Sequence, residues 1–258
     1  MLSRSATISF FIVITILFSC VSDPQSKAPE HTEEDTTTNK QVPVIEAWQG
    51  NLNGTIPVLM WYSKTDSVLY GQVYYTNQKA PKPIKIIGVV QDNSYRILEF
   101  MSDGNITGIW SLTPQVSSAE GDWFGSENKK TLNTSLMHID TAVNIADISE
   151  IDNVTGTYSY AYGKDGGAGH LEVKQIDSKA IIVNFENVTS APAYNMAFMK
   201  DTVSISNNIA QYHSDEFGSC SFKLAFYNNF VIVDYVNDEA DCGFGHNATV
   251  DGIYLKTQ

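Results

Sequence analysis

The chain has 258 residues, and its 29 Asp and Glu residues outnumber its 16 Lys and Arg residues, which gives a formal charge of −13. Nucleic-acid binding depends on Lys and Arg that neutralise phosphates, so this composition argues against a nucleic-acid partner. The acidity could attract cations or a basic protein over a long range, or it could simply keep an exported domain soluble.

The first residues have the pattern of a secretory signal peptide. Arg4 supplies the positive charge and Ile8 to Phe18 form an apolar run, shorter than the roughly 20 residues that a membrane-spanning helix needs. The run ends in Leu17-Phe18-Ser19-Cys20, which resembles the lipobox of bacterial lipoproteins. This resemblance implies cleavage after residue 19, lipid such as palmitate on the Cys20 thiol, and a location in the cell envelope, at the outer membrane, facing the periplasm or the cell surface. The alternative is an ordinary cleaved signal peptide that contains a cysteine.

Residues 20–42 are predicted to carry the lipid and form a flexible tether. Without residues 1–19 the chain has 15 basic and 29 acidic residues, a charge of 15 − 29 = −14. Val21 to Gln41 consist mainly of Ser, Pro, Thr, Lys and acidic residues, with too few apolar side chains to offset the entropy lost on ordering. The sequence therefore predicts a disordered linker between the lipid and the folded part.

Beyond Pro43 the sequence predicts an all-β fold. Short apolar or alternating runs rich in Val, Ile, Tyr, Phe and Trp are separated about every ten residues by turn-forming residues. We expect two antiparallel β-meander domains, each a barrel or a sandwich, over residues 43–140 and 151–258. A single larger barrel or sandwich is the alternative. In the first half the predicted strands are Ile56–Tyr62, Val68–Tyr75, Ile84–Val90, Tyr95–Met101, Ile106–Leu112, one around Trp123 and one at Ser135–Ile139.

Residues 141–150 are predicted to connect the two halves and form the one plausible helix, in which Val143, Ala146 and Ile148 are loosely spaced apolar residues. Asn228-Asn229 is predicted to close a tight hairpin through positive φ angles. The predicted strands of the second half are Gly156–Tyr162, Gly169–Ile176, Ala180–Asn187, Thr202–Ser206, Ile209–His213, Cys220–Tyr227, Phe230–Val236 and Val250–Lys256.

The three cysteines predict one disulfide. If Cys20 carries lipid, Cys220 and Cys242 remain as a pair, and an oxidising compartment outside the cytoplasm would preserve a bond between them. Cys220 also alternates with Phe222, Leu224 and Phe226 on one face of a strand, so the bond is expected at the edge of the core.

The first half resembles a recurrent β-meander of uncharacterised envelope lipoproteins from Bacteroidota-type bacteria. The resemblance covers roughly residues 44–139 and implies an exported β-domain, without any catalytic residue. It rests on Trp48-Gln49-Gly50, Ile56-Pro57-Val58, Tyr70–Tyr75, Ile87-Gly88, Leu98-Glu99-Phe100, Gly104, Thr107-Gly108 and Gly121-Asp122-Trp123.

The C-terminal part, from Cys220 to Tyr254, resembles the disulfide-bridged ends of small periplasmic β-domains, among them the membrane-bound lysozyme inhibitors. Cys242–Asn247 and Asp251–Tyr254 carry this likeness. It implies an acidic lipoprotein that binds a basic enzyme. The sequence departs from the inhibitors because no Ser-Gly-aromatic stretch precedes the last strands.

Three histidines are candidate ligand residues: His170, His213 and His246. Brought together they could bind a metal ion, since neutral imidazole is a common ligand. Their spacing does not match a zinc site. Separate loop or strand-end histidines are therefore favoured, and no metal or cofactor is expected.

Tyr158, Tyr160 and Tyr162 recur with period two, which first indicates one face of a sheet. Core packing is the favoured interpretation. The alternative is a binding surface for sugar or protein, together with His170, His246 and the glycine-rich loop Asp165–Gly169, which lacks the Gly-Lys-Ser/Thr of a phosphate-binding loop.

The sequence offers no Gly-x-Ser-x-Gly elbow or comparable catalytic signature. It therefore favours a non-enzymatic binding or structural module of the envelope. The alternatives are an inhibitor or sensor of a basic protein such as a lysozyme, and, third, an enzyme that acts on glycan.

Overall fold

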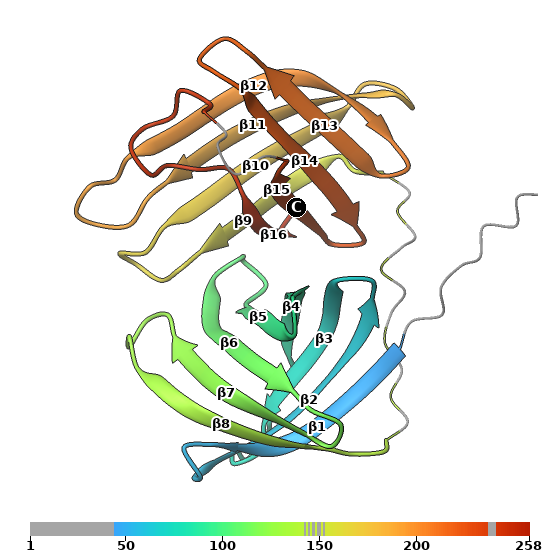
Figure 1. Ribbon diagram of the computed structural model, residues 1–258, viewed down its shortest axis with the longest axis vertical. Helices are drawn as coiled ribbons and strands as arrows, with labels where there is room; N and C mark the ends of the chain where they lie inside the picture. Colours follow the sequence, from blue (N-terminus) through green and yellow to red (C-terminus); the bar gives the residue numbers. More distant parts are fainter. Residues whose placement is uncertain are drawn as a thin grey trace, which may run out of the picture. The chain divides into compact units, whose positions relative to one another are not determined.

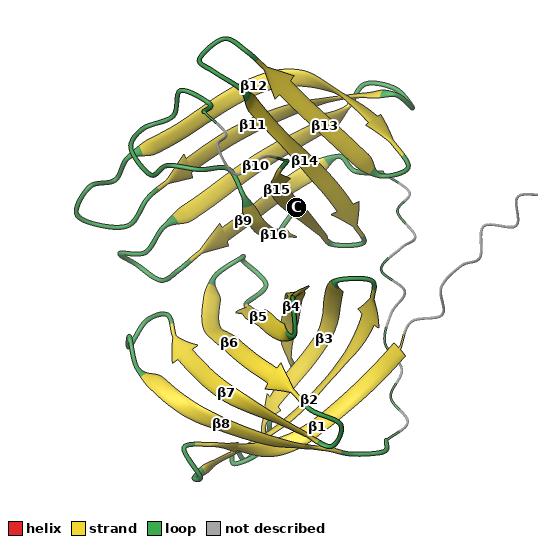
Figure 2. Cartoon of the chain, viewed as in Figure 1, coloured by secondary structure: helices red, strands yellow, loops and turns green. Residues whose placement is uncertain are grey.

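A computed structural model describes residues 44–258, apart from residues 142, 144, 146, 147, 149, 150, 152 and 237–240. Its secondary structure is β-strand throughout, in sixteen strands that form two closed antiparallel barrels (Figure 2). The predicted all-β class with two meanders is confirmed, and each meander is a barrel rather than a sandwich. The predicted signal peptide, Cys20 and the tether lie outside the described residues.

The first barrel contains eight strands in sequence order, each hydrogen-bonded to the next, with β8 returning to pair with β1 (Figure 1). This is the simplest way to leave no strand edge exposed. Its strands are β1 (Val44–Leu52), β2 (Ile56–Thr65), β3 (Val68–Tyr75), β4 (Ile84–Gln91), β5 (Ser94–Phe100), β6 (Ile106–Pro114), β7 (Ser118–Gly125) and β8 (Thr131–His138).

The second barrel repeats this meander and closes by pairing β16 with β9. Its strands are β9 (Gly156–Ala161), β10 (Ala168–Gln175), β11 (Ala180–Val188), β12 (Met196–Ser206), β13 (Ile209–Ser214), β14 (Cys220–Tyr227), β15 (Phe230–Tyr235) and β16 (Gly252–Lys256).

Asparagine residues with positive φ angles form two of the hairpin turns in the second barrel. Tyr227 pairs with Phe230 across Asn228-Asn229, and Asn229 has a φ of 79°. Asn207 and Asn208 turn β12 into β13 with φ values of 51° and 62°. Asparagine tolerates this left-handed conformation better than most residues, so both hairpins are encoded locally. The predicted hairpin at Asn228-Asn229 is confirmed.

Alternation along the strands fills each interior. On β14, Cys220, Phe222, Leu224 and Phe226 are buried, while Lys223 between them is exposed. This confirms the predicted core face.

Two predictions about local structure need correction. No strand was predicted for residues 44–52, where β1 forms, and β12 begins at Met196, six residues before its predicted start at Thr202. Both segments carry Gln, Asn, Lys or Asp on their outward positions, which weakens the strand pattern, and pairing with neighbouring strands overrides that preference. The predicted helix at 141–150 lies largely outside the described residues, and Thr141, Val143, Ile145 and Ile148 are in neither helix nor strand.

Candidate functional site

The second barrel has an incomplete seam between β12 and β13. β12 pairs with β11 from Met196 to Ser204, but with β13 only through three residue pairs, Ser204–Gln211 to Ser206–Ile209. β13 instead follows β14 over its whole length. The first part of β12 therefore separates from β13 and opens the wall of the barrel.

The segment 241–249 runs along this opening and is tied to it at three points. The Gly245 amide donates to the Met196 carbonyl (3.0 Å), and the Asn195 side-chain amide donates to the His246 carbonyl (2.7 Å). The third tie is the Cys220–Cys242 disulfide, whose Cα atoms lie 4.7 Å apart. The predicted disulfide is confirmed, and it joins the start of β14 to the segment that borders the opening.

A cleft of about 230 Å³ lies between β12, the turn after β13 and segment 241–249. The disulfide and four aromatic rings line it: Phe198, Tyr212, Phe217 and Phe244. Phe198 is 56% exposed and Phe217 is 62% exposed. Large apolar side chains that gather on a surface, rather than occurring singly, indicate an interaction site.

The rim of the cleft is acidic. Asp201 and Glu216 line it, and two further carboxylates, Asp215 and Asp241, lie on the segments that border it. Lys200 is the one cationic side chain among its lining residues. The balance of charge therefore favours a cationic ligand.

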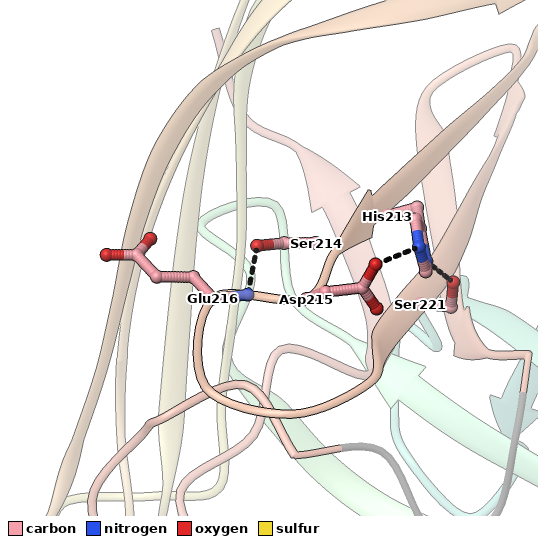
Figure 3. A network of polar contacts seen from close by, with 5 residues as sticks. All are labelled: His213, Ser214, Asp215, Glu216 and Ser221. Atoms are coloured by element: carbon pink, nitrogen blue, oxygen red, sulfur yellow. Dashed lines mark hydrogen bonds and ion pairs between the residues drawn. The ribbon is translucent and has the colours of Figure 1, made fainter.

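A polar network holds the turn that carries Phe217 (Figure 3). His213 Nδ1 lies 2.9 Å from Ser221 Oγ, and His213 Nε2 lies 3.3 Å from Asp215 Oδ2. In the same turn the Glu216 amide donates to Ser214 Oγ (3.2 Å). His213 and Ser221 are directly opposite each other on β13 and β14, so strand register brings them together.

This network contains the residue types of a Ser-His-Asp triad, but its environment differs from that of a hydrolase. The side chains of His213 and Asp215 are 60% and 77% exposed. Water at such a site weakens the electrostatic hold of the carboxylate on the imidazole. We therefore assign the network a structural role, in which it fixes the 215–219 turn beside the cleft.

The first barrel contains a different polar cluster, in its interior. Glu99 is 1% exposed, and it is the one charged side chain that is buried in the described part of the chain. Its Oε1 accepts hydrogen bonds from Tyr75 Oη (2.6 Å), Trp110 Nε1 (2.8 Å) and Trp123 Nε1 (3.2 Å), and its Oε2 accepts one from Thr107 Oγ1 (3.2 Å).

Burial raises the pKa of Glu99, and the four donors oppose that rise. Gly108 lies opposite Glu99 on β6, and a Cβ atom there would collide with Glu99 Oε2 and Trp123 Nε1. The glycine therefore makes room for the carboxylate. Because the Glu99 carboxylate at the centre of this cluster is buried, we assign the cluster to the stability of the barrel and not to ligand binding.

No family model, curated protein or solved structure matches this chain. The site must therefore be interpreted from its own geometry. In the described residues no α-helix combines the length and the apolar character needed to cross a bilayer.

The structure places the predicted tyrosines mainly in the core. Tyr158 is 1% exposed and its hydroxyl donates to the Val154 carbonyl (2.7 Å). Tyr160 is half-buried, with its ring 4.8 Å from Tyr254 and 5.5 Å from Tyr162. Tyr158 therefore belongs to the barrel interior, in agreement with the favoured interpretation, and does not form part of a binding surface.

The predicted histidines lie in separate places. His170 is on β10, and its Nε2 lies 3.7 Å from Glu172 Oε1. His246 is in an exposed turn, where its carbonyl accepts a hydrogen bond from the side-chain amide of Asn195. His213 belongs to the network described above. Within the described ranges no group of three or more His, Cys, Asp and Glu side chains is arranged to hold a metal ion.

The role of the aromatic rings in the cleft was not predicted from the sequence. Phe217 stands in Asp215-Glu216-Phe217-Gly218-Ser219, where a large apolar residue interrupts a run of turn-forming residues. That position was a usable signal, because a ring within a polar turn has no core to fill. Phe198 gave no such signal, because it stands in the apolar run Met196–Met199, and apolar runs are ordinarily assigned to the core.

Proposed function

We propose that the protein is a non-enzymatic binding protein of the bacterial envelope, anchored by lipid on Cys20. In this proposal the cleft between β12 and the 215–219 turn captures a cationic segment of another protein. The observation that carries the proposal is the coincidence of exposed aromatic rings with an acidic rim at one cleft.

Arg and Lys side chains fit such a surface in two ways. Their aliphatic stems and cationic groups pack over aromatic faces, here Phe198 and Phe217. Their charge is attracted to the carboxylates of Asp201 and Glu216 at the rim. An anionic or purely apolar ligand would use only part of this surface.

The binding test uses a library of displayed short random peptides and the exported chain with Cys20→Ser, which removes the proposed lipid. We expect the selected peptides to be enriched in Arg and Lys beside apolar residues. The double variant Phe198→Ala/Phe217→Ala should lower their affinity about tenfold or more, because exposed aromatic anchors contribute a large share of binding energy.

The matched control is Val116→Ala/Ile176→Ala, which removes two exposed apolar side chains away from the cleft. It should leave affinity unchanged. Selected peptides without basic enrichment, or peptides that bind the Phe198→Ala/Phe217→Ala variant normally, would overturn the proposed function.

The same chemistry would serve an inhibitor of a basic enzyme. Lysozyme is a suitable probe, and its activity should be measured with and without the protein. Inhibition that Asp201→Asn/Glu216→Gln weakens would identify the protein as an inhibitor, whereas binding without inhibition would identify it as a carrier or sensor.

The anchor has its own test. Cys20→Ala should move the protein from the membrane fraction to the soluble exported fraction, because lipid on that thiol is the proposed attachment. If the variant still sediments with membranes after washing in high salt, the proposed anchor is wrong.

A further inference from the structure

A second surface, on the outside of the first barrel, has a chemistry unlike that of the cleft. Here β1 meets β8 and closes the barrel, and their outward side chains face each other in pairs: Gln49 opposite Met137 and Asn51 opposite Ser135. The pairing continues past the strand end, where the Asn53 amide donates to the Asn133 carbonyl (2.7 Å). These six residues border a groove of about 710 Å³.

None of the residues that line this groove is ionisable. The chain as a whole is 17% charged and strongly acidic, so a neutral surface of this size contrasts with its general composition. Asn53 lies in the turn after β1 with a φ of 49°, which Asn tolerates. Asn is, however, disfavoured within β-strands, so Asn51 on β1 and Asn133 on β8 are poor choices for sheet stability. Sheet formation alone therefore does not account for these residues.

The polar groups of the groove are free to bind a ligand. The side chains of Gln49, Asn51, Asn53, Asn133 and Ser135 make no hydrogen bond within the described protein. Each carboxamide presents an acceptor and two donors side by side, and Ser135 adds a hydroxyl that can do either. Met137, which is 57% exposed, adds an apolar contact.

A peptide would not use this surface well. Extended peptides bind sheets mainly by adding a strand to an exposed edge through main-chain hydrogen bonds. The main-chain groups of β1 and β8 are already paired with each other where the barrel closes. A ligand must therefore bind through the outward side chains.

We propose that this groove, which we call the amide groove, binds an uncharged oligosaccharide. The hydroxyls of a neutral sugar can donate to and accept from the paired carboxamides at once, and the C–H face of a sugar ring can pack on Met137. The lining residues follow β1 and β8 from Gln49 and Met137 to Asn51 and Ser135, and this extended arrangement suits a chain of sugar units. This site is independent of the cationic-ligand cleft of the second barrel.

The experiment titrates the exported Cys20→Ser chain with neutral oligosaccharides derived from starch, cellulose, chitin and mannan. Oligogalacturonate serves as the anionic comparison, and binding is followed by calorimetry. At least one neutral oligosaccharide should bind, and more tightly than oligogalacturonate. The double variant Asn51→Thr/Asn133→Thr should weaken that binding about tenfold or more, because it removes two of the carboxamides that would bond to the sugar hydroxyls.

Threonine favours β-strands, so this variant should keep the fold, and circular dichroism would verify it. The matched control is Gln211→Thr, which removes an exposed strand carboxamide from β13 of the second barrel and should leave sugar binding unchanged. The proposal is overturned if none of the neutral oligosaccharides binds, if oligogalacturonate binds as well as they do, or if the double variant binds normally.

Discussion

The two barrels share one topology but are stabilised differently. In the first barrel every neighbouring pair of strands is joined by at least five residue pairs. In the second, β12 and β13 share three pairs and β16 and β9 share two. The second barrel also carries the disulfide, beside its incomplete seam. The comparison shows that an eight-stranded meander can leave part of its wall open when a covalent bond secures the covering segment.

The interiors of the two barrels also differ, in the kind of polar group that each one buries. The interior of the first barrel contains the buried carboxylate of Glu99 and the rings of Trp48 and Trp110, and the other two tryptophans, Trp61 and Trp123, also lie on strands of this barrel. The second barrel buries a neutral polar group, Asn187, whose side-chain amide donates to Tyr254 Oη (2.6 Å) and to the Thr249 carbonyl (2.8 Å). A buried charged group is costly unless it is hydrogen-bonded. The barrel with the more continuous strand pairing is the one that contains Glu99 together with its hydrogen-bond donors.

The largest expected effect is the loss of the buried carboxylate. Glu99→Ala should lower the free energy of unfolding by about 4 kcal/mol, because it leaves a cavity and deprives the buried donor of Trp110 and the part-buried donors of Tyr75 and Trp123 of their acceptor. Urea denaturation followed by tryptophan fluorescence measures this. Glu120→Ala removes an exposed carboxylate of β7 and should change stability by no more than about 0.5 kcal/mol. Similar values for the two variants would show that the interior cluster does not stabilise the first barrel.

The disulfide should have the next largest effect. It closes a loop of 22 residues, so Cys220→Ala/Cys242→Ala should lower the free energy of unfolding by roughly 3 kcal/mol. The native tryptophan emission should stay the same, since every tryptophan lies in the first barrel. A reducing agent should destabilise the unmodified protein to the same extent and leave the variant unaffected. Unchanged stability of the variant would contradict the idea that the second barrel depends on this bond.

The next expected effect is a pH dependence of the free energy of unfolding that arises from Glu99 in the first barrel. Burial raises the pKa of Glu99 above the 4.5 of an exposed glutamate, so in that range the folded protein keeps a proton that the unfolded chain releases. The contribution of this group to stability is therefore complete below pH 4.5 and is lost as the pH rises through the folded pKa. The slope is at most about 1.4 kcal/mol per pH unit.

Glu99→Gln keeps the shape of the side chain and abolishes this titration. The stability of the unmodified protein relative to the variant should therefore fall with increasing pH, as measured by urea denaturation at a series of pH values. Parallel curves for the two proteins would mean that Glu99 titrates normally in the folded state.

The smallest expected effect concerns the chain that precedes both barrels. Deletion of residues 21–41 should leave the melting temperature unchanged, because this segment has neither an apolar period nor predicted strands. Scanning calorimetry measures this. A large decrease would mean that the segment packs on the fold and contributes to one of the barrels.

The strands were predictable where local signals agreed. The range Val68–Tyr75 was predicted with the bounds that β3 has, and the Asn228-Asn229 hairpin followed from turn chemistry alone. β1 was missed because Gln49, Gly50 and Asn51 are poor strand formers that pairing with β2 and β8 holds in place. Gln49 and Asn51 also supply the carboxamides of the amide groove on β1, so this groove was not predicted from the sequence.

Glu99 lies on a predicted strand, but its hydrogen-bond partners do not follow from the sequence. Its strand was predicted, and alternation with Tyr95 and Ile97 could have placed it on the inward face. Its partners could not be predicted, because Tyr75, Thr107, Trp110 and Trp123 come from three other strands. The register of those strands decides whether they point at the carboxylate, and a shift of one residue would turn them outward.

By itself the sequence determined the all-β class, two meanders, most strand positions and the pairing of Cys220 with Cys242. These features depend on alternation, turn residues and cysteine arithmetic, which act over short stretches or by simple elimination. Only the tertiary structure decided that the meanders close into barrels, that β12 leaves β13, and that Phe198 and Phe217 share an acidic cleft. Those outcomes depend on which distant strands pair and where their pairing stops, and long-range hydrogen bonding and packing set that for the chain as a whole.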